Sequence, residues 1–183
     1  MKRGDEMNDI LITTKRLNIR ELRVQDAQLL YEYSQEDAAR KQLADEVQAN
    51  PQEARETIEY LRSRYGQGYP LVYALAERET DQLVGHISLS QISEGVEIGY
   101  AVSETYQGQG YAAEAIAAFS QWALQVMEPE ILYAVIKEKN LPSRRAAEKA
   151  GYQLFSLEER CFLGEPCRTA VYTFTAQSRP DNG

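Results

Sequence analysis

Polar and apolar residues alternate near the start of the chain with the two-residue period of a half-buried strand. Within residues 11–22, Leu17 and Ile19 follow this alternation, and Leu22 continues it less regularly. We therefore expect the first strand in this segment.

Two helices should follow, because the apolar residues change to a spacing of three and four positions. Asp26 is a candidate N-cap for the first helix. The second has a clearer start: Asn50 suits the N-cap, Pro51 the first helical position and Glu53 the third. The apolar residues of the first helix are Ala27, Leu29, Leu30 and Tyr33. Those of the second are Ile58, Leu61 and Tyr65, and Gly66 and Gly68 end it.

Three apolar runs separated by short polar breaks come next, at residues 71–78, 83–90 and 96–102. They predict an antiparallel meander. Residues 110–127 return to the helical period, and Pro129 stops this helix. Its apolar residues are Ala112, Ala115, Ile116, Phe119, Trp122, Ala123 and Val126.

The rest of the chain predicts a buried strand at residues 131–137 and a short helix that has Pro142 at its first position and Gly151 just beyond its end. Two last strands, at residues 152–160 and 167–176, are joined through the turn sequence FLGEP. Together these elements indicate one α+β domain, a mainly antiparallel sheet with helices on its faces.

The length of 183 residues suits a single domain. We expect it to occupy residues 11–176, between polar tails at residues 1–10 and 177–183. The first ten residues lack the apolar segment of a signal peptide, and no apolar run approaches the ~20 residues of a membrane helix. A cytoplasmic protein without membrane contact is expected, and the net charge of −8 argues against a nucleic-acid partner.

The two cysteines, Cys161 and Cys167, are interpreted as reduced thiols, because a disulfide framework would need more of them. The chain has one histidine and no Cys-x-x-Cys pair, which argues against a metal site. That histidine, His86, lies in a predicted strand and is interpreted as a structural residue.

The sequence ETYQGQGYAAEA, at residues 104–115, places two glycines directly before the most alanine-rich helix. Glycine can adopt φ > 0, and a helix start presents unpaired N–H groups and a partial positive charge, so this arrangement suits a phosphate or pyrophosphate. A plain strand-to-helix turn is the alternative. The stretch lacks the Lys-Ser/Thr pair of a nucleotide P-loop and the third glycine of a dinucleotide fingerprint.

Gln107, Gly110 and Ala112 match the Q/R-x-x-G-x-G/A signature, and here the chain resembles the GNAT superfamily of acyl-CoA-dependent N-acyltransferases. The surrounding VEIGYAVSETYQGQGYAAEA resembles the branch that includes the bacterial ribosomal-protein N-terminal acetyltransferases. TTKRLNIREL is similar to the first strand of that branch, and NLPSRRAAEKAGY to its Asn-x-x-Ser segment. The likeness extends over residues 11–175.

The resemblance implies a mixed, mainly antiparallel sheet that is splayed between its fourth and fifth strands, where the pantetheine arm of acetyl-CoA would lie. The arm would use backbone groups of Tyr100, Ala101 and Val102. Asn140 would hold the arm or shape its loop, with a simple turn asparagine as the alternative. The pyrophosphate would lie on the residues of the glycine loop, Gln107, Gly108, Gln109, Gly110, Tyr111 and Ala112.

Basic residues are concentrated between residues 137 and 149, where five basic residues accompany two acidic ones. Such a patch suits the phosphates of coenzyme A, and Arg145 is the residue we assign to them. A solvated helix face is the alternative.

Acetyl transfer requires a base for the amine, and Glu97 is the first candidate because related enzymes often carry a glutamate on the strand that leads to the loop. A solvated strand residue is the alternative for Glu97. Glu94 and Glu114 are weaker candidates, and we expect Glu114 to stabilise the first turn of its helix.

The proton donor for the leaving thiolate is less evident. Many related enzymes use a tyrosine eight residues after the motif asparagine, where this chain has Glu148, which we expect to point toward Arg144 or Arg145. Ser143 is the predicted hydrogen-bond donor, with helix capping as its alternative role. Tyr152 or solvent would otherwise supply the proton.

The sequence thus predicts an acetyl-CoA-dependent N-acetyltransferase without a metal, which moves the acetyl group directly to a primary amine in a ternary complex. The acceptor would be a protein N-terminus or a small amine, and residues 36–70 are expected to select it. The alternative is a coenzyme A-binding sensor or interaction module without turnover. Monomer and homodimer both remain open.

Overall fold

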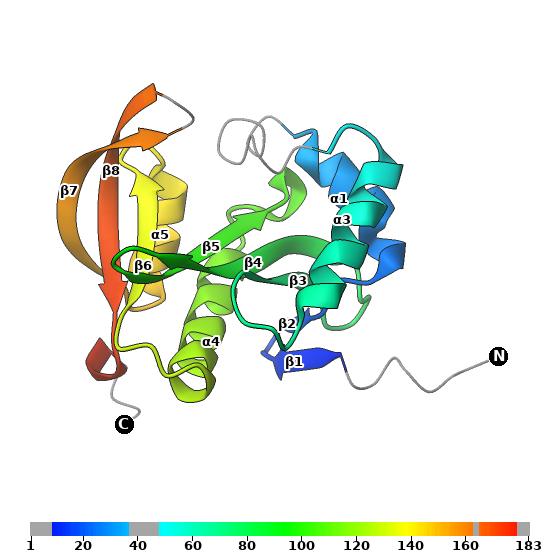
Figure 1. Cartoon of the computed structure of the whole chain (residues 1–183), viewed down its shortest axis with the longest axis horizontal. Helices are drawn as coiled ribbons and strands as arrows, with labels where there is room; N and C mark the ends of the chain where they lie inside the picture. The colour runs from blue at the N-terminus through cyan, green and yellow to red at the C-terminus, as the bar shows by residue number, and fades with distance from the viewer. Residues whose placement is uncertain (1–8, 37–47, 163–164, 179–183) are drawn as a thin grey trace.

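One mixed sheet organises the chain in the computed structural model, which describes residues 9–36, 48–162 and 165–178. Within these residues it has eight strands in the order β1-β2-β3-β4-β5-β6-β8-β7 (Figure 1). Among the described strands only β5 and β6 pair in parallel, and the other neighbours are antiparallel. The strands are β1 (Ile10–Thr13), β2 (Leu17–Arg20), β3 (Leu71–Glu77), β4 (Leu83–Ile92), β5 (Gly95–Val102), β6 (Leu132–Lys137), β7 (Gln153–Phe162) and β8 (Glu165–Phe174).

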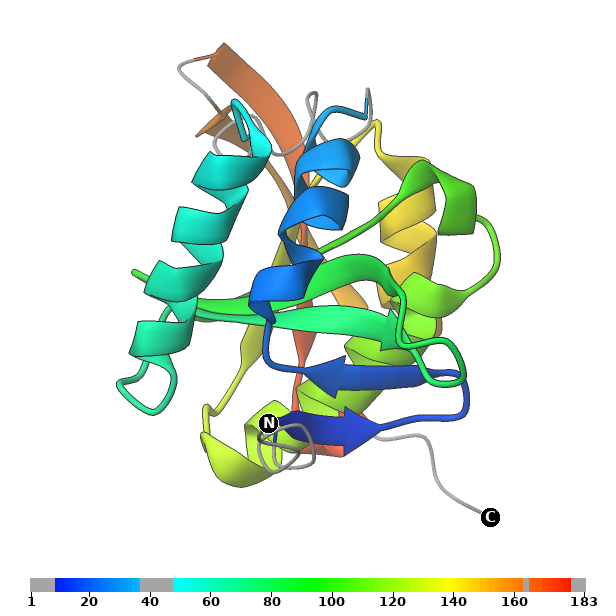
Figure 2. The same cartoon turned by 90° about the vertical axis from the view of Figure 1, so that its right-hand side faces the viewer.

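Helices cover both faces of the sheet (Figures 1 and 2). Their bounds are α1 (Ala27–Ser34), α3 (Pro51–Arg64), α4 (Tyr111–Val126) and α5 (Leu141–Lys149), and 3₁₀ turns lie at Val24–Asp26, Glu104–Tyr106 and Ala176–Ser178. Successive side chains of a strand point to opposite faces. On β3, Tyr73 and Leu75 accordingly pack in the cluster that includes α4, whereas Ala74 packs with Ile58 of α3. The predicted α+β fold with helices on both faces is confirmed.

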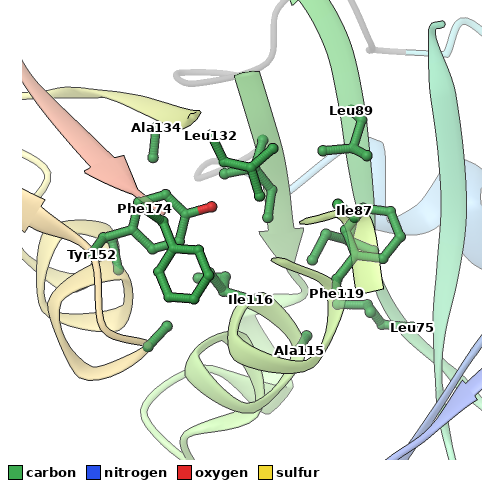
Figure 3. Close-up of a cluster of buried hydrophobic side chains, with 14 of the residues drawn as sticks. Leu75, Ile87, Leu89, Ala115, Ile116, Phe119, Leu132, Ala134, Tyr152 and Phe174 are labelled. Carbon is green, nitrogen blue, oxygen red and sulfur yellow. The ribbon is translucent and has the colours of Figure 1, made fainter. Parts of the chain in front are cut away.

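The main core lies between the sheet and α4. Ile116 and Phe119 of α4 meet Ile87 of β4, and Phe174 of β8 closes the far side (Figure 3). Phe119 is stacked on Trp122, with ring centroids 5.2 Å apart. This packing fixes α4, and so holds the glycine loop before it at the end of β5.

The predicted first strand is two strands. β1 and β2 form an antiparallel hairpin, and Thr14 closes its turn by accepting the Leu17 N–H at 2.9 Å. The splay expected between the fourth and fifth strands therefore lies between β5 and β6. β1 begins at Ile10, the last residue of the predicted N-terminal tail; residues 1–8 and 179–183 of the predicted tails lie outside the described residues.

Asp26 occupies the predicted N-cap position of α1, but its side chain makes no capping hydrogen bond. Its carboxylate binds the fully buried guanidinium of Arg20, at 2.8 and 3.0 Å, and accepts the Arg23 N–H. A buried charge requires a paired, hydrogen-bonded partner, and this tertiary demand takes precedence over capping. Asn50, in contrast, caps α3 as predicted, by accepting the N–H groups of Gln52 and Glu53.

Two smaller predictions differ from the structure. Pro142 is the second residue of α5, because the helix begins at Leu141 after its N-cap Asn140. Val126, predicted in the buried stripe of α4, is 58% exposed and is the last residue of the helix.

Candidate active site

The parallel pairing of β5 and β6 is short. Val96 pairs with Leu132 and Glu97 with Tyr133, and beyond these residues the two strands separate while β5 stays paired with β4 (Figure 1). Where β5 and β6 no longer pair, the edges that face each other present backbone N–H and C=O groups that need partners. The segment predicted to hold the pantetheine arm, Tyr100–Val102, lies on β5 within this splay.

Glu97 lies at the point where the splay opens. Its neighbours Val96 and Ile98 face the core, so Glu97 faces the opposite side of the sheet. The side chain is half-buried and accepts a hydrogen bond from the Val135 N–H of β6. Burial raises the pKa of Glu97, against the lowering effects of that hydrogen bond and of Arg160. A solvated strand residue would not carry this combination of burial and a raised pKa.

Tyr100 crosses the splay on the other face. Its hydroxyl donates to the Ser143 carbonyl at 2.9 Å and accepts from the Ser143 hydroxyl at 2.8 Å, which joins β5 to the first turn of α5. Burial raises the pKa of Tyr100 to about 12, so the phenol is protonated at neutral pH. Asn140 caps α5 through the Ser143 N–H at 3.3 Å. Ser143 is therefore not the helix cap, and its hydroxyl is directed at Tyr100.

Glu148 occupies the place where many related enzymes have a tyrosine, and it points toward β8. It accepts a hydrogen bond from the Tyr172 hydroxyl at 2.6 Å, and Arg144 donates to the same hydroxyl at 2.9 Å. The expectation that Glu148 points directly at an arginine of α5 is therefore only partly met, because Tyr172 lies between Glu148 and Arg144.

Tyr152, the alternative proton donor, is a core residue. It is 3% exposed, its ring is stacked on Phe174, and its hydroxyl is hydrogen-bonded to Ser120 at 2.8 Å (Figure 3). Burial raises the pKa of Tyr152. These contacts argue against a part in proton transfer.

The glycine loop, residues 107–112, follows β5 after the 3₁₀ turn at Glu104–Tyr106. Gly108 and Gly110 adopt φ of 73° and 84°, and Gly110 is the N-cap of α4. Among the described residues no side chain caps this helix start, which leaves its first N–H groups without a side-chain partner, as an anion site requires. Gln107 closes the loop by donating to the Val102 carbonyl at 2.9 Å, and Gln109 donates to the Thr105 carbonyl at 3.1 Å.

The other residues assigned to acetyl-CoA are spread around this loop. Tyr111 is buried and donates its hydroxyl to Glu77 at 2.8 Å, so only its backbone is available to a phosphate. Ala112 is half-buried in the first turn of α4, and Ala101 is paired with His86 on β4. Arg145 is exposed on α5, and in the described part of the chain it has no hydrogen bond or ion pair.

Sequence reasoning missed two side chains at the site. The Tyr100 hydroxyl was overlooked because only the backbone of that residue was considered. Arg16, in the turn between β1 and β2, donates to the Gln109 carbonyl at 2.8 Å and to Glu114 at 2.7 Å. The signal was present, since Arg16 belongs to the TTKRLNIREL stretch, but the contact spans more than 90 positions of sequence.

The remaining candidates have structural roles. Glu114, predicted to stabilise the start of α4, is bound there by Thr14 and Arg16. Glu94 is exposed beside Arg160, and the buried His86 packs against the ring of Tyr33.

Both cysteines are free and lie on the hairpin of β7 and β8. In the described residues no group of three or more His, Cys, Asp or Glu side chains is arranged to hold a metal ion. None of the helices described here is long and apolar enough to cross a membrane.

A mixed sheet that splays beside a glycine loop at a helix start defines the class of acyl-CoA-dependent acyltransferases. A family model described as "Acetyltransferase (GNAT) domain" matches residues 16–153. The match covers most of the chain, which therefore belongs to the GNAT acetyltransferase family. It is an N-acetyltransferase that uses acetyl-CoA as cosubstrate and an amine as acceptor.

Individual relatives agree with this assignment. The "Uncharacterized N-acetyltransferase YnaD" of Bacillus subtilis (strain 168) is 29% identical over 152 residues, which cover 82% of this chain and 86% of YnaD. A GNAT-family acetyltransferase from Bacillus anthracis has a similar structure, with a TM-score of 0.78 and 23% identity over 91% of this chain and 98% of that one. RimL, a ribosomal L7/L12 alpha-N-protein acetyltransferase solved in complex with coenzyme A, has a TM-score of 0.78 at 17% identity, over 93% of this chain and all of RimL (100%).

Proposed function

We propose that this enzyme transfers the acetyl group of acetyl-CoA directly to a primary amine within a ternary complex, with Glu97 as the general base. The observation that carries the proposal is the position of Glu97: it is half-buried at the opening of the splay, bound to the Val135 N–H, with a raised pKa. A base with a pKa raised toward neutral pH accepts a proton more readily than an ordinary carboxylate does.

Acetyl-CoA would enter between β5 and β6. Its pantetheine arm would use the backbone of Tyr100–Val102, and its pyrophosphate would lie on the N–H groups of the loop from Gln107 to Ala112. Arg145, exposed in the middle of α5, has no partner for its guanidinium among the described residues and is the cation we assign to a phosphate.

The leaving thiolate would be stabilised by hydroxyl groups on the face opposite Glu97. Residues 97 and 100 lie three positions apart on one strand, so their side chains point to opposite faces. Ser143 remains our hydrogen-bond donor to the thiolate. Its single O–H proton donates to the Tyr100 oxygen at 2.8 Å, so the hydroxyl would turn from Tyr100 to the sulfur as the thiolate forms.

The charges around Glu97 favour a cationic acceptor. Arg160 binds Glu94 at 3.3 Å and Glu158 at 3.1 Å, so three carboxylates including Glu97 accompany one guanidinium. This excess would draw an ammonium group toward the base. An α-amine has a pKa near ~8 and a lysine ~10.4, so a protein N-terminus loses its proton more readily than a lysine side chain does.

The test is an acetylation screen with N-terminal peptides and small primary amines, read by release of the coenzyme A thiol and by the mass of the product. We expect transfer to at least one α-amine at neutral pH and a fall in kcat on the order of 10²-fold for Glu97→Gln. Glu94→Gln is the matched control, because it removes an exposed carboxylate beside the same arginine; it should change KM for a cationic acceptor more than kcat. Full activity of Glu97→Gln would remove Glu97 from the mechanism.

Direct transfer has a separate test. The intact protein, incubated with acetyl-CoA and no amine, should keep its mass, and a Cys161→Ser/Cys167→Ser variant should retain its rate. An acetylated protein that passes its acetyl group to an added amine would instead establish a covalent intermediate.

A further inference from the structure

Arg16 contacts the glycine loop from the side of the first hairpin. Its Nη1 donates to the Gln109 carbonyl at 2.8 Å, and the guanidinium lies 4.4 Å from the ring centroid of Tyr111. An added Cβ at Gly110 would be 3.5 Å from Nη2 of Arg16. One arginine thus contacts, or nearly contacts, three consecutive residues of the loop, although it lies more than 90 positions earlier in the sequence.

Glu114, in the first turn of α4, fixes this arginine. Its carboxylate accepts the Arg16 Nε at 2.7 Å, the Arg16 backbone N–H at 2.8 Å and the Thr14 hydroxyl at 2.7 Å. Burial raises the pKa of Glu114, but the hydrogen bonds from Thr14 and Arg16 outweigh it, and the net pKa is lowered. Glu114 is therefore ionised at neutral pH and holds the guanidinium in one orientation.

The orientation of the Gln109 carbonyl decides where the next N–H points. The peptide bond is planar and trans, so the C=O of Gln109 and the N–H of Gly110 point in opposite directions. Because Arg16 holds that carbonyl toward the β1–β2 turn, the Gly110 N–H is aimed away from the turn. Gly110 adopts φ of 84°, and a backbone in the left-handed region returns easily to other conformations unless it is held.

We infer that Arg16, fixed by Glu114, is a positioning residue that holds the glycine loop in the conformation that binds the phosphates of acetyl-CoA. It acts through the Gln109–Gly110 peptide and not by touching a phosphate. The inference rests on the proposed placement of these phosphates on the loop.

Substitution of Glu114 distinguishes a charge effect from a positioning effect, because the two predict opposite changes in the affinity for coenzyme A. A carboxylate near an anion site repels the anion, so Glu114→Gln should tighten binding of coenzyme A if charge alone matters. If Glu114 fixes the positioning arginine, the same change should raise the Kd of coenzyme A about tenfold, equivalent to about 1.4 kcal/mol. A Kd that is unchanged or lower would overturn the inference.

Arg16→Lys provides the second arm. Lysine keeps the positive charge but lacks the fork that joins Glu114 to the Gln109 carbonyl, so we expect Arg16→Lys and Arg16→Gln to raise the Kd alike, again about tenfold. Retention of normal affinity by Arg16→Lys, with loss in Arg16→Gln, would mean that the charge itself contacts the ligand and would refute the positioning role.

The kinetic readout separates positioning from a loss of folded protein. These variants should raise KM for acetyl-CoA while kcat and the acceptor KM stay at wild-type values; unfolding would lower kcat as well. Ser120→Ala is the control for reduced stability, because it removes the buried hydrogen bond from α4 to Tyr152. Arg55→Gln is the control for lost charge, because Arg55 is in an exposed ion pair with Glu59 on α3. An equal rise of KM in either control would overturn the inference.

If the glycine loop does not bind the phosphates of acetyl-CoA, the binding measurements will give a different pattern. If the loop is not the phosphate site, replacing Gly110 by valine will leave coenzyme A binding intact. If the loop is the site but Arg16 does not position it, the Gly110 variant alone will lose binding.

Discussion

Replacing Gly110 by valine tests the glycine loop most directly, because its consequences can be worked out from the backbone. Gly110 adopts φ of 84°, and the nearest atom to an added Cβ is Nη2 of Arg16, at 3.5 Å. That is ordinary contact, so the protein should still fold. The conflict is conformational: valine strongly disfavours positive φ, and relaxation to negative φ would turn the Gly110 N–H away from the ligand.

Two magnitudes follow. Holding an L-residue in the left-handed region costs roughly 1–2 kcal/mol. At about 2–4 °C of Tm per kcal/mol for a chain of this size, the free variant should melt about 2–8 °C below the wild type. Acetyl-CoA at a hundred times its Kd stabilises the wild type by about 2.7 kcal/mol, which corresponds to roughly 5–10 °C, and this increase should disappear in the variant.

The assay is thermal unfolding with and without acetyl-CoA, and the chain offers a matched control. Gly66, which follows α3 on the other face of the sheet, adopts φ of 80° and has nothing within 4 Å of an added Cβ. Gly66→Val should therefore lower the Tm of the free protein by a similar amount and keep the full increase with acetyl-CoA. A folded Gly110→Val protein that retains the wild-type increase would refute the assignment of the loop.

Three further predictions concern the chemistry. Glu97→Gln should lower kcat on the order of 10²-fold and leave acetyl-CoA binding intact. Glu97→Gln should also raise Tm at pH 7. The folded pKa of Glu97 is raised, so the stability that protonated Glu97 provides is present below the unfolded pKa and is lost as pH rises through the folded pKa. The Tm difference between variant and wild type should therefore shrink on acidification, and a constant difference would contradict the buried carboxylate. Ser143→Ala and Tyr100→Phe should each lower kcat with little change in KM for acetyl-CoA. The kcat of the double variant should fall by less than the product of the two single reductions, and a fully multiplicative fall would mean that the hydroxyls act independently. Tyr152→Phe should lower Tm, because it removes the buried bond to Ser120, and keep kcat; a large fall in kcat would restore Tyr152 as the acid.

The parts of the fold that depend on neighbouring residues were predictable from the sequence. The cap of α3 by Asn50 needs only the next three residues, and α4 follows from its own apolar period and the glycines before it. The glycine loop was recognisable for the same reason, since positive φ and a helix start are local properties of residues 107–112.

Features that depend on distant partners could not be predicted in this way. Asp26 has the composition of a cap, but the buried Arg20 takes its carboxylate. The Ser143 hydroxyl meets Tyr100 from 43 positions away, and helix capping and hydrogen bonding to a ligand fit the same local sequence equally well. Arg16 shows the limit most clearly: the TTKRLNIREL stretch marks its hairpin by resemblance, but its local pattern does not indicate that the turn lies against α4.

The position of β5 explains why one short strand can supply both ends of the proposed reaction. Two pairs of residues join it to β6, and the strands then diverge, so both faces of β5 border the same opening. Glu97 reaches the Val135 N–H on one face, and three residues later Tyr100 reaches Ser143 on the other. A continuous ladder between β5 and β6 would place these groups on opposite sides of a closed sheet, with no path for a thioester between them. The short pairing would therefore allow the proposed base and the proposed leaving-group hydroxyls to meet one substrate.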